Sequence, residues 1–590
     1  MRRLAEGLER LLTGVSAAIL AVLLAVVLLA VALRYFFATG LIGSEELAIW
    51  LYVALISVGA PLTAGRSLGM RMDVFSRLLP PWGQAMAEVV ADGFVIVGAL
   101  VLIGGGVDIV TNLGSTSTAL GLPEWIRFAL PAVGGGLTLL VLALGRLGEG
   151  AVKRLLASLL LGGIGFYAAQ VGVVPSDLPP SAFAGLIALI GLLVGAPIAH
   201  VLLACAYLAL PFGASMPEPA IAASAVAGMS KFLLLAIPFF LLAGGIFAAS
   251  DLAQGLIRFA GSLVGHWRGG LAQTTLMTSV LFSGASGSSI ANAAFMATSM
   301  GPALVKRGYQ PAQAGGIIAA TAMLDNIIPP SIAFLILAAA TGLSVGKLLT
   351  GGLFAGLVLA VALGIAIRLT AREAPSEKST SAERWRSGWL AAPALGLGIV
   401  VIAGVRFGLV TTTEASALAA LYTILVCLRR PGGRSAILQG FREAAVTSAA
   451  IGLLIGAASP LAFLIAVDDL GSIATQAVQA LGSHAAGVML LANLVLLVAG
   501  LFLDTGVAIL LLAPILLPVA TAAGIDPIQF GVILIVNLMI GSLTPPVGML
   551  VYVVGGVMRL PVGWVFHAVL PFLAALLLAL AVLCAAALIF

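Results

Sequence analysis

The sequence predicts an all-α polytopic membrane protein built from two matched halves. It has 590 residues, of which 61% are hydrophobic and 9% are charged, whereas a soluble domain carries about 25% charged residues. Charge-free runs such as 269–305 and 560–590 recur along the chain and exceed the roughly 20 residues that a helix needs to span a bilayer. A stretch near the carboxyl end also repeats an earlier one.

The repeat joins residues 308–331 to residues 524–548 at a fixed spacing of 216 residues. Both copies begin with Gly, share Pro, Gln, Gly and Ile at matched positions, and contain a Pro-Pro pair, at 329–330 and 545–546. Proline inside an apolar helix breaks it, because the ring clashes with the preceding turn and lacks an N–H group. Two such breaks at corresponding positions predict the binding site of a secondary transporter.

Residues 1–150 predict a small four-helix unit, followed by a linking helix and a Pro-rich connection at 151–180. The first apolar run is too long for a signal peptide and lacks a cleavage site of small residues. The loop that follows the second helix carries Arg66, Arg71 and Arg77 against Asp73, and this excess of arginine places it in the cytoplasm. The membrane helices are expected at about 14–33, 46–64, 84–107 and 125–145, with the linking helix at 155–174.

Residues 181–590 predict the large transport subunit, with repeat one at 181–367, a cytoplasmic loop at 368–388 and repeat two at 389–590. Repeat one is expected to hold two short helices at 181–195 and 197–210, a helix at 229–250, an amphipathic segment at 251–268, a run at 269–305, a broken helix at 312–340 and a helix at 348–367. Repeat two is expected to hold helices at 389–408, 413–428 and 444–466, a run at 485–520, a broken helix at 528–553 and a last helix at 563–588.

The runs 269–305 and 485–520 are too long for one span and carry small polar residues midway. We expect each to be a re-entrant hairpin, which a membrane tolerates where protein or water covers the turn. The placement of Lys and Arg starts repeat one outside and repeat two inside, so the repeat is inverted, with the amino end inside and the carboxyl end outside.

The hairpin tips carry the groups expected to do chemistry. The first tip is 283–289, the second is 504–506, and Ser288 matches Asp504 at the 216-residue spacing. Oxygen-rich tips suit a hard cation such as Na⁺, and the amino ends of half-helices suit a carboxylate. The alternative is that Gly and Ser only allow close helix packing; recurrence at matched positions, each before a Pro-Pro break, favours a site.

Asp504 is the strongest single candidate. An ionisable group in mid-membrane costs about 2.5–3.5 kcal/mol to insert and is a functional candidate by default. No Lys or Arg stands between Arg442 and Arg559 to pair with it. Glu414 and Glu45-Glu46 lie near predicted helix ends, where interfacial solvation accounts for them.

Other residues favour no enzyme or nucleotide chemistry. The four His are scattered and are expected to be structural, and three single Cys predict neither a disulfide framework nor a metal cluster. No phosphate-cradling GxxxxGK[ST] loop occurs. The net charge of +5 fits cytoplasmic loops that set topology better than nucleic-acid binding.

The chain resembles the fused (QM-type) membrane subunit of tripartite ATP-independent periplasmic (TRAP) transporters, in which a small four-helix part is joined to a large part. The resemblance covers nearly the whole chain. The matching motifs are Arg34-Tyr35, Ser44-Glu45-Glu46-Leu47-Ala48, Arg71-Met72-Asp73, ASGSS (285–289), DNIIPPS (325–331), TTTEAS (411–416), FLDTG (502–506) and LTPPVG (543–548).

The resemblance implies Na⁺-coupled import of an organic acid across the bacterial inner membrane by an elevator-type motion. It also implies a periplasmic substrate-binding protein as partner, Na⁺ as coupling ion with no other cofactor, no enzymatic activity, and a monomeric fused unit in the lipid bilayer. The substrate stays open among carboxylates such as a C4-dicarboxylate, sialic acid or a sugar acid. A stand-alone ion-coupled anion carrier of the same superfamily and an ion channel are the alternatives.

The resemblance also implies two half-sites that bind Na⁺ or substrate. Asp325-Asn326 stand where the family usually has a Gly-rich approach to the first Pro-Pro pair. The first half-site is expected at Ser286, Ser288, Ser289, Asn292, Asn326, Pro329, Pro330 and Ser331. The second is expected at Asp504, Thr505, Gly506, Asn537, Gly541, Thr544, Pro545 and Pro546.

Overall fold

In the residues that the computed structural model describes, helices joined by turns and loops make up the regular secondary structure, apart from one isolated β-bridge. Ten of its helices are long and apolar enough to cross a membrane, or eleven if one bent pair counts as a single span. The described residues are 1–64, 71, 74–171, 178–214, 216–250, 252–371, 373, 377–470, 472, 476 and 484–589. Most of the predicted cytoplasmic loop at 65–77 and residues 175–177 of the Pro-rich connection lie outside them.

The chain packs into two compact units, each made of two separate segments. The first unit holds residues 1–238 and 441–473, and the second holds residues 239–440 and 474–590. The sequence domains 1–150, 151–180 and 181–590 follow the order of the chain instead and stay predictions. Both predicted half-sites fall in the second unit.

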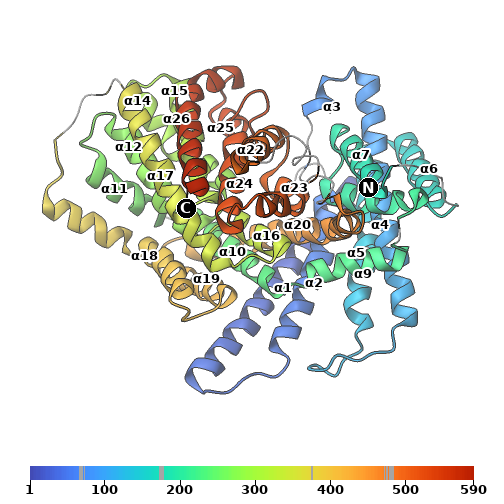
Figure 1. The fold of residues 1–590 in the computed structure, drawn as a ribbon. Helices are drawn as coiled ribbons and strands as arrows, with labels where there is room; N and C mark the ends of the chain where they lie inside the picture. The colour runs from blue at the N-terminus through green and yellow to red at the C-terminus, as the bar shows by residue number, and fades with distance from the viewer. Residues whose placement is uncertain are drawn as a thin grey trace. The chain divides into compact units, whose positions relative to one another are not determined.

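The first unit begins with the four predicted membrane helices, which are confirmed as α1, α2, α4 and α5 (Figure 1). α2 and α4 both pack against α5, and α1 packs against α2. Proline at the first turn starts α4 and α7, where a missing N–H costs nothing. The helices of this unit are α1 Arg2–Phe36, α2 Ser44–Ala64, α3 Val74–Leu78, α4 Pro81–Asn112, α5 Trp125–Gly148, α6 Val152–Ala168, α7 Pro180–Leu193, α8 Ile198–Leu208, η1 Leu210–Phe212, α9 Glu218–Met229 and η2 Phe232–Leu235, with most of α20 Gly433–Val467.

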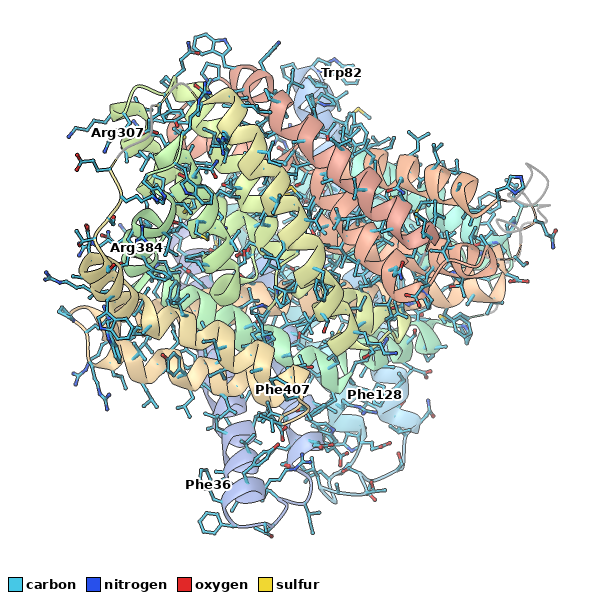
Figure 2. The ribbon with its side chains drawn as sticks, turned by 60° about the vertical axis from the view of Figure 1, so that its left-hand side comes forward. Phe36, Trp82, Phe128, Arg307, Arg384 and Phe407 are labelled. Atoms are coloured by element: carbon cyan, nitrogen blue, oxygen red, sulfur yellow. The ribbon has the colours of Figure 1, made fainter. Side chains whose placement is uncertain are left out.

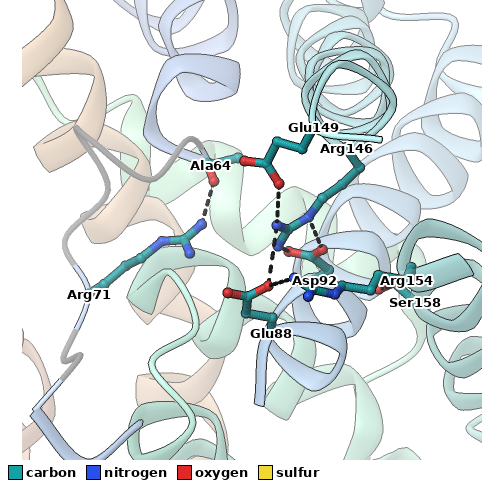
Figure 3. A network of polar contacts seen from close by, with 8 residues as sticks. All are labelled: Ala64, Arg71, Glu88, Asp92, Arg146, Glu149, Arg154 and Ser158. Atoms are coloured by element: carbon teal, nitrogen blue, oxygen red, sulfur yellow. Dashed lines mark hydrogen bonds and ion pairs between the residues drawn. The ribbon is translucent and has the colours of Figure 1, made fainter. Parts of the chain in front are cut away.

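A buried ion network ties the linking helix α6 to the four-helix part (Figure 3). Arg146, at the end of α5, donates from Nε to Asp92 Oδ2 at 2.6 Å and from Nη2 to Asp92 Oδ1 at 2.8 Å. Its Nη1 also reaches Glu149 Oε2 at 3.1 Å. Arg154 of α6 donates to Glu88 of α4 at 2.8 Å. The bidentate Arg–Asp geometry satisfies two charges that the bilayer would otherwise leave unpaired.

The two short helices expected at 181–195 and 197–210 are confirmed as α7 and α8. The single helix expected at 229–250 is wrong. Helix α9 precedes it, and the path bends by 53° at the break between α9 and the following segment of η2 and α10. Pro219 lies in the first turn of α9, and the exposed Lys231 lies at the bend. Helix α9 is rich in Ala and has no amphipathic pattern, so the sequence did not predict it.

The second unit contains the hairpin runs and both broken helices. The predicted breaks are confirmed: α15 and η3 end before 327–331, and α24 ends before 542–548. The helices of this unit are most of α10 Ala236–Ala248, α11 Leu252–Val264, α12 Gly270–Ser286, α13 Ser289–Ser299, α14 Gly301–Lys306, α15 Pro311–Ala322, η3 Met323–Asn326, α16 Ile332–Thr341, α17 Val345–Thr370, α18 Ser381–Arg406, α19 Thr412–Leu428, α22 Ala485–Phe502, α23 Thr505–Ala522, α24 Pro527–Gly541, α25 Met549–Met558 and α26 Val562–Ile589.

Packing within the second unit follows the sequence repeat. α13 and α25 pack together, and so do their counterparts in the other half, α23 and α16. α15 packs against α26, while its counterpart α24 packs against α17, the counterpart of α26. Each half therefore completes the core of the other, as expected for two repeats related by a pseudo-two-fold axis.

The hairpin runs are each split into two helices at the predicted tips. α12 and α13 pack against each other and against α15, and α22 and α23 pack against each other and against α24. The re-entrant course of each run through the membrane stays a prediction.

Several predicted boundaries are wrong; α1, for example, begins at Arg2 and not at about residue 14. The loop expected at 368–388 is shorter, because α17 continues to Thr370 and α18 begins at Ser381. Thr380 caps α18 by accepting a hydrogen bond from the Glu383 N–H at 3.2 Å, so polar residues read as loop are the first turns of a helix. α20 likewise begins at Gly433, eleven residues before the expected start at 444.

Aromatic residues lie at the ends of several membrane helices (Figure 2). In the first unit, Phe36 and Phe128 lie at one end and Trp82 lies at the other. In the second unit, Arg384 and Phe407 lie at opposite ends of α18. This alternation agrees with the predicted order of spans; the assignment of each end to the cytoplasm or the outside stays a prediction.

Candidate functional site

The tip of the first hairpin touches the first break. Gly287, between α12 and α13, has a φ of 66°, a left-handed conformation that glycine adopts without strain. A Cβ at this position would lie 2.8 Å from the carbonyl oxygen of Pro330. Both Pro-Pro bonds, 329–330 and 545–546, are cis. Because of its positive φ and this close approach to Pro330, position 287 requires glycine where the predicted tip meets the predicted break.

Ser289 joins the first tip to the segment before the break. Its Oγ donates to the Met323 carbonyl at 3.3 Å and accepts from the Asn326 N–H at 3.2 Å. Ser331, on the other side of the break, donates from Oγ to the Asn326 carbonyl. Ser289, Asn326 and Ser331, all predicted for the first half-site, thus form one hydrogen-bonded group.

The second half makes the equivalent contact. Thr505 Oγ1 donates to Met539 Sδ at 3.4 Å, and Thr505 and Met539 follow Ser289 and Met323 by 216 residues. The same pair of positions therefore connects tip to broken helix in both halves. In the first half the acceptor is a backbone oxygen, and in the second it is a sulfur.

The two half-sites meet at Met539. Asn326 of the first half donates from Nδ2 to Met539 Sδ at 3.5 Å, the same sulfur that Thr505 contacts. The predicted residues from both halves are therefore brought together within the second unit. Met539 itself was missed, because a methionine in an apolar run carries no signal beyond its match to Met323.

Three predicted site residues are also helix caps. Ser288 accepts from the Ala291 N–H at the start of α13, and Ser331 accepts from the Phe334 N–H at the start of α16, both at 3.4 Å. Asp504 Oδ1 accepts from the Gly506 N–H at 2.9 Å at the start of α23. Half-helix amino ends, with their positive partial charge, thus converge on both tips and on the first break.

Asn292 carries a buried amide without a partner. Its side chain is fully buried, and neither Oδ1 nor Nδ2 has a hydrogen-bond partner among the described residues. Leaving a buried polar group unsatisfied costs about 1–3 kcal/mol. An amide kept at that cost one turn after the first tip is suited to meet a ligand.

Asn537 is held by a residue that sequence reasoning missed. Its Nδ2 donates to the carbonyl oxygen of Asn493 at 2.9 Å and to Asn493 Oδ1 at 2.5 Å, and its own Oδ1 is buried without a partner among the described residues. Nearby, Gly541 packs so closely on α22 that a Cβ would lie 2.7 Å from the backbone of Gly500. Gly541 therefore also serves close helix packing.

The remaining predicted residues differ between the halves. Pro329 and Pro330 are buried, whereas Pro545 and Pro546 are exposed. Thr544 donates to the Ile540 carbonyl at 2.9 Å. Asp325, where the first half departs from the usual Gly-rich pattern, is fully buried. Gly506, in the second tip, is buried. The side chain of Ser286 lies outside the described part of the chain.

Glu414 lies near the start of α19, as predicted, but the solvation predicted for it is wrong. It is 8% exposed and forms a capping box with Thr411, in which Glu414 Oε2 accepts from the Thr411 N–H at 2.8 Å and the Thr411 Oγ1 accepts from the Glu414 N–H at 3.2 Å. This arrangement satisfies two N–H groups at the start of α19.

Among the described residues, no group of three or more His, Cys, Asp or Glu could hold a metal ion.

A multi-pass protein with two matched halves, broken helices and a shared central site belongs to the class of secondary transporters. Family patterns narrow this class. The pattern of the tripartite ATP-independent periplasmic transporter, DctM component, matches residues 184–589, and that of the DctQ component matches residues 23–151. The chain belongs to the TRAP transporter permeases and joins both components in one multi-pass protein of the bacterial inner membrane.

The similarity to known relatives covers most of the length of each relative. The isethionate TRAP transporter permease protein DctMQ of Oleidesulfovibrio alaskensis is 30% identical over 558 residues, which cover 92% of this chain and 86% of that protein. The C4-dicarboxylate TRAP transporter large permease protein DctM of Pseudomonas aeruginosa is 37% identical over 59% of this chain and 82% of its own. The sialic acid TRAP transporter large permease protein SiaM of Vibrio cholerae is 34% identical over 60% and 84%.

Proposed function

We propose that this permease imports an organic acid by Na⁺-coupled transport and receives it from a periplasmic binding protein. The observation that carries the proposal is the convergence of Asn326, Thr505 and Met539, which brings two oxygen-rich half-sites together. The named substrates of the relatives, among them isethionate, C4-dicarboxylates and sialic acid, are all organic anions. An organic anion is therefore the substrate class.

The residues around the tips fit a sodium ion. Na⁺ is a hard cation that favours oxygen ligands, as Ca²⁺ and Mg²⁺ do. Asp504 supplies a carboxylate, Asn292 supplies an amide oxygen to which no described residue donates, and Ser288 supplies a hydroxyl. A bound Na⁺ would supply positive charge that attracts the anionic substrate, and the amino ends of α13, α16 and α23 add to that attraction.

The division into two units supports an elevator-type motion. Both tips and both breaks belong to the second unit, although residues 441–473 of the first unit interrupt it in the sequence. A site contained in one compact unit can cross the membrane with that unit as a rigid body, which is one form of alternating access. The first unit, with its four-helix part, is then the static partner.

The test is uptake of the four radiolabelled acids named for the relatives, isethionate, a C4-dicarboxylate, 2,3-diketo-L-gulonate and sialic acid. Cells deficient in uptake would carry this chain alone, or with the binding protein encoded beside it. We expect one acid to accumulate with saturation, and only when both proteins are present. Equal uptake by the chain alone would favour a stand-alone carrier, and non-saturating equilibration would favour a channel.

A further inference from the structure

A cavity of about 720 Å³ lies in the second unit, away from the tips and breaks. Three parts of the chain far apart in the sequence line it: residues of 307–313 at the start of α15, Thr370 and Glu373 at and after the end of α17, and residues of 564–572 in the first turns of α26. No residue of either half-site contributes to it. The cavity is therefore separate from both predicted half-sites.

The polar side of the cavity favours a negatively charged oxygen ligand. Arg307 is largely exposed, and its ion pair within the described part of the chain, from Nη1 to Glu373 Oε1, is long at 3.9 Å. A guanidinium has five N–H donors, so most of them remain for a ligand. His567 lies beside it with Nδ1 2.8 Å from the Gly563 carbonyl, and Gln313 adds an amide.

The acidic residue of the cavity is already engaged. Glu373 Oε2 accepts from the Leu271 N–H at 3.2 Å and from the Tyr309 hydroxyl at 3.0 Å, and the Glu373 carbonyl accepts from the Gly269 N–H at 3.2 Å. Its charge is thus directed at the first turn of α12 and at Tyr309. Glu373 also links the cavity to the base of the first hairpin run.

The apolar side of the cavity continues into a surface suited to lipid. Ala568, Pro571 and Phe572 of α26 line it. α17 packs against α26, and Leu369 and Leu570 on these two helices are exposed by 75% and 47%. Trp564 is exposed at the polar end of α26, as tryptophans are at the boundary between hydrocarbon and headgroups.

We propose that this cavity binds the phosphate headgroup of an anionic phospholipid from the cytoplasmic leaflet, with an acyl chain along α17 and α26. Basic pockets at the cytoplasmic ends of membrane helices hold such headgroups. The predicted topology places Arg307 and residues 370–373 on that side. Glu373 lines the cavity and accepts hydrogen bonds from the N–H groups of Leu271 and Gly269. The lipid therefore lies next to the contacts that hold the start of α12.

Native mass spectrometry of the purified full chain tests the proposal, with phosphatidylglycerol and phosphatidylcholine of identical acyl chains as probes. We expect the wild-type protein to retain at least fivefold more phosphatidylglycerol than phosphatidylcholine. The double variant Arg307→Gln with His567→Gln loses that preference, and Gln313→Trp, which fills the cavity, also lowers phosphatidylglycerol binding. Arg386→Gln, an exposed arginine of α18 that does not line the cavity, is the matched control and keeps the preference.

Two outcomes would overturn the proposal. The first is equal retention of phosphatidylglycerol by wild type, the double variant and Gln313→Trp, each shown to be folded by its thermal unfolding curve. The second is full displacement of phosphatidylglycerol by millimolar inorganic phosphate together with Arg307-dependent heat protection by that phosphate alone, which would make this a site for a free cytoplasmic anion.

Discussion

At the scale of single residues, Asp504 and Ser288 hold equivalent positions and do equivalent structural work, since each caps the half-helix that follows it. The sequence predicted both as ligands from their 216-residue match. It could not show that capping already uses one acceptor of each. A carboxylate has about four lone-pair sites, so Asp504 can accept from the Gly506 N–H and still face a cation.

The variant Asp504→Asn separates the two roles. Asparagine caps a helix about as well as aspartate, so thermal stability in Na⁺-free buffer should hold, while the lost charge should raise the Na⁺ concentration for half-maximal stabilisation by at least tenfold. Asp526→Asn is the matched control, because Asp526 caps α24 with a 2.9 Å bond to the Gln529 N–H. Thermal unfolding across a Na⁺ titration gives the answer; identical midpoints for wild type and Asp504→Asn would contradict the assignment.

Asn292→Leu tests the amide that has no protein partner. Removing it deletes no hydrogen bond seen in the protein and relieves a desolvation cost of about 1–3 kcal/mol, so the Na⁺-free protein should be as stable as wild type or more so. The Na⁺ midpoint should rise about tenfold, which corresponds to about 1.4 kcal/mol of binding free energy. Asn112→Leu, at an exposed helix end, is the control. An unchanged midpoint would exclude Asn292 from the sodium shell.

Other site residues could not be predicted singly. Asn326, Thr505 and Asn537 were predicted from motifs, but their contacts Met539 and Asn493 lie in apolar runs where a methionine or a lone asparagine has many explanations. Which residues face one another depends on how α22, α23 and α24 pack, and a period of 3.6 residues does not determine that packing. The sequence therefore predicted one residue of each contact and missed its partner.

At the scale of elements, the breaks and spans were predictable because proline and long apolar runs act locally. The Pro-Pro pairs predicted where η3 and α24 end, and the charge-free runs predicted most of the membrane helices. Prediction failed where tertiary contacts decide: α9 has no amphipathic face to reveal it, and α18 begins in polar residues because Thr380 caps it. Helix α6 gave no sign of its ion pair to α4, since Glu88 and Arg154 are 66 residues apart.

The Asp92–Arg146 pair gives the element-scale prediction. Asp92→Asn removes the buried bidentate partner of Arg146 and leaves the guanidinium its ion pairs to the more exposed Glu149 at 3.1 Å and Glu88 at 3.6 Å; breaking a buried ion pair costs up to about 3–5 kcal/mol. The thermal midpoint of the full chain, followed by tryptophan fluorescence, should fall clearly. Glu149→Gln, whose side chain is 46% exposed, should cost at most about 1 kcal/mol. If Asp92→Asn unfolds at the temperature of wild type, the network does not stabilise the four-helix part.

At the scale of the whole molecule, the two compact units give the transport model its moving and static parts. The sequence showed the inverted repeat but ordered its domains along the chain, whereas the units are formed from interleaved segments. Only packing shows that residues 441–473 belong with the amino-terminal part. The boundary at residue 441 falls inside the continuous helix α20, so no loop or linker marks it in the sequence.

An elevator motion predicts that distances within the second unit stay constant while distances between units change. Spin labels at the exposed positions Val305 and Leu428 lie within the second unit, and a label at exposed Trp82 lies in the first. In a background without the native cysteines, the 305–428 distance distribution should be the same with and without Na⁺ and substrate, and the 305–82 distribution should change. Constant distributions for both pairs under all conditions would argue against a rigid-body motion.

Proteoliposomes that contain the full chain test the central claim most directly, with the binding protein and its acid supplied outside and one ion gradient imposed at a time. We predict that an inward Na⁺ gradient drives the acid above its external concentration, that reversing the gradient abolishes accumulation, and that Asp504→Asn needs a much higher Na⁺ concentration. Accumulation driven by a proton gradient in the absence of Na⁺, or equilibration that ignores every gradient, would contradict sodium coupling at this site.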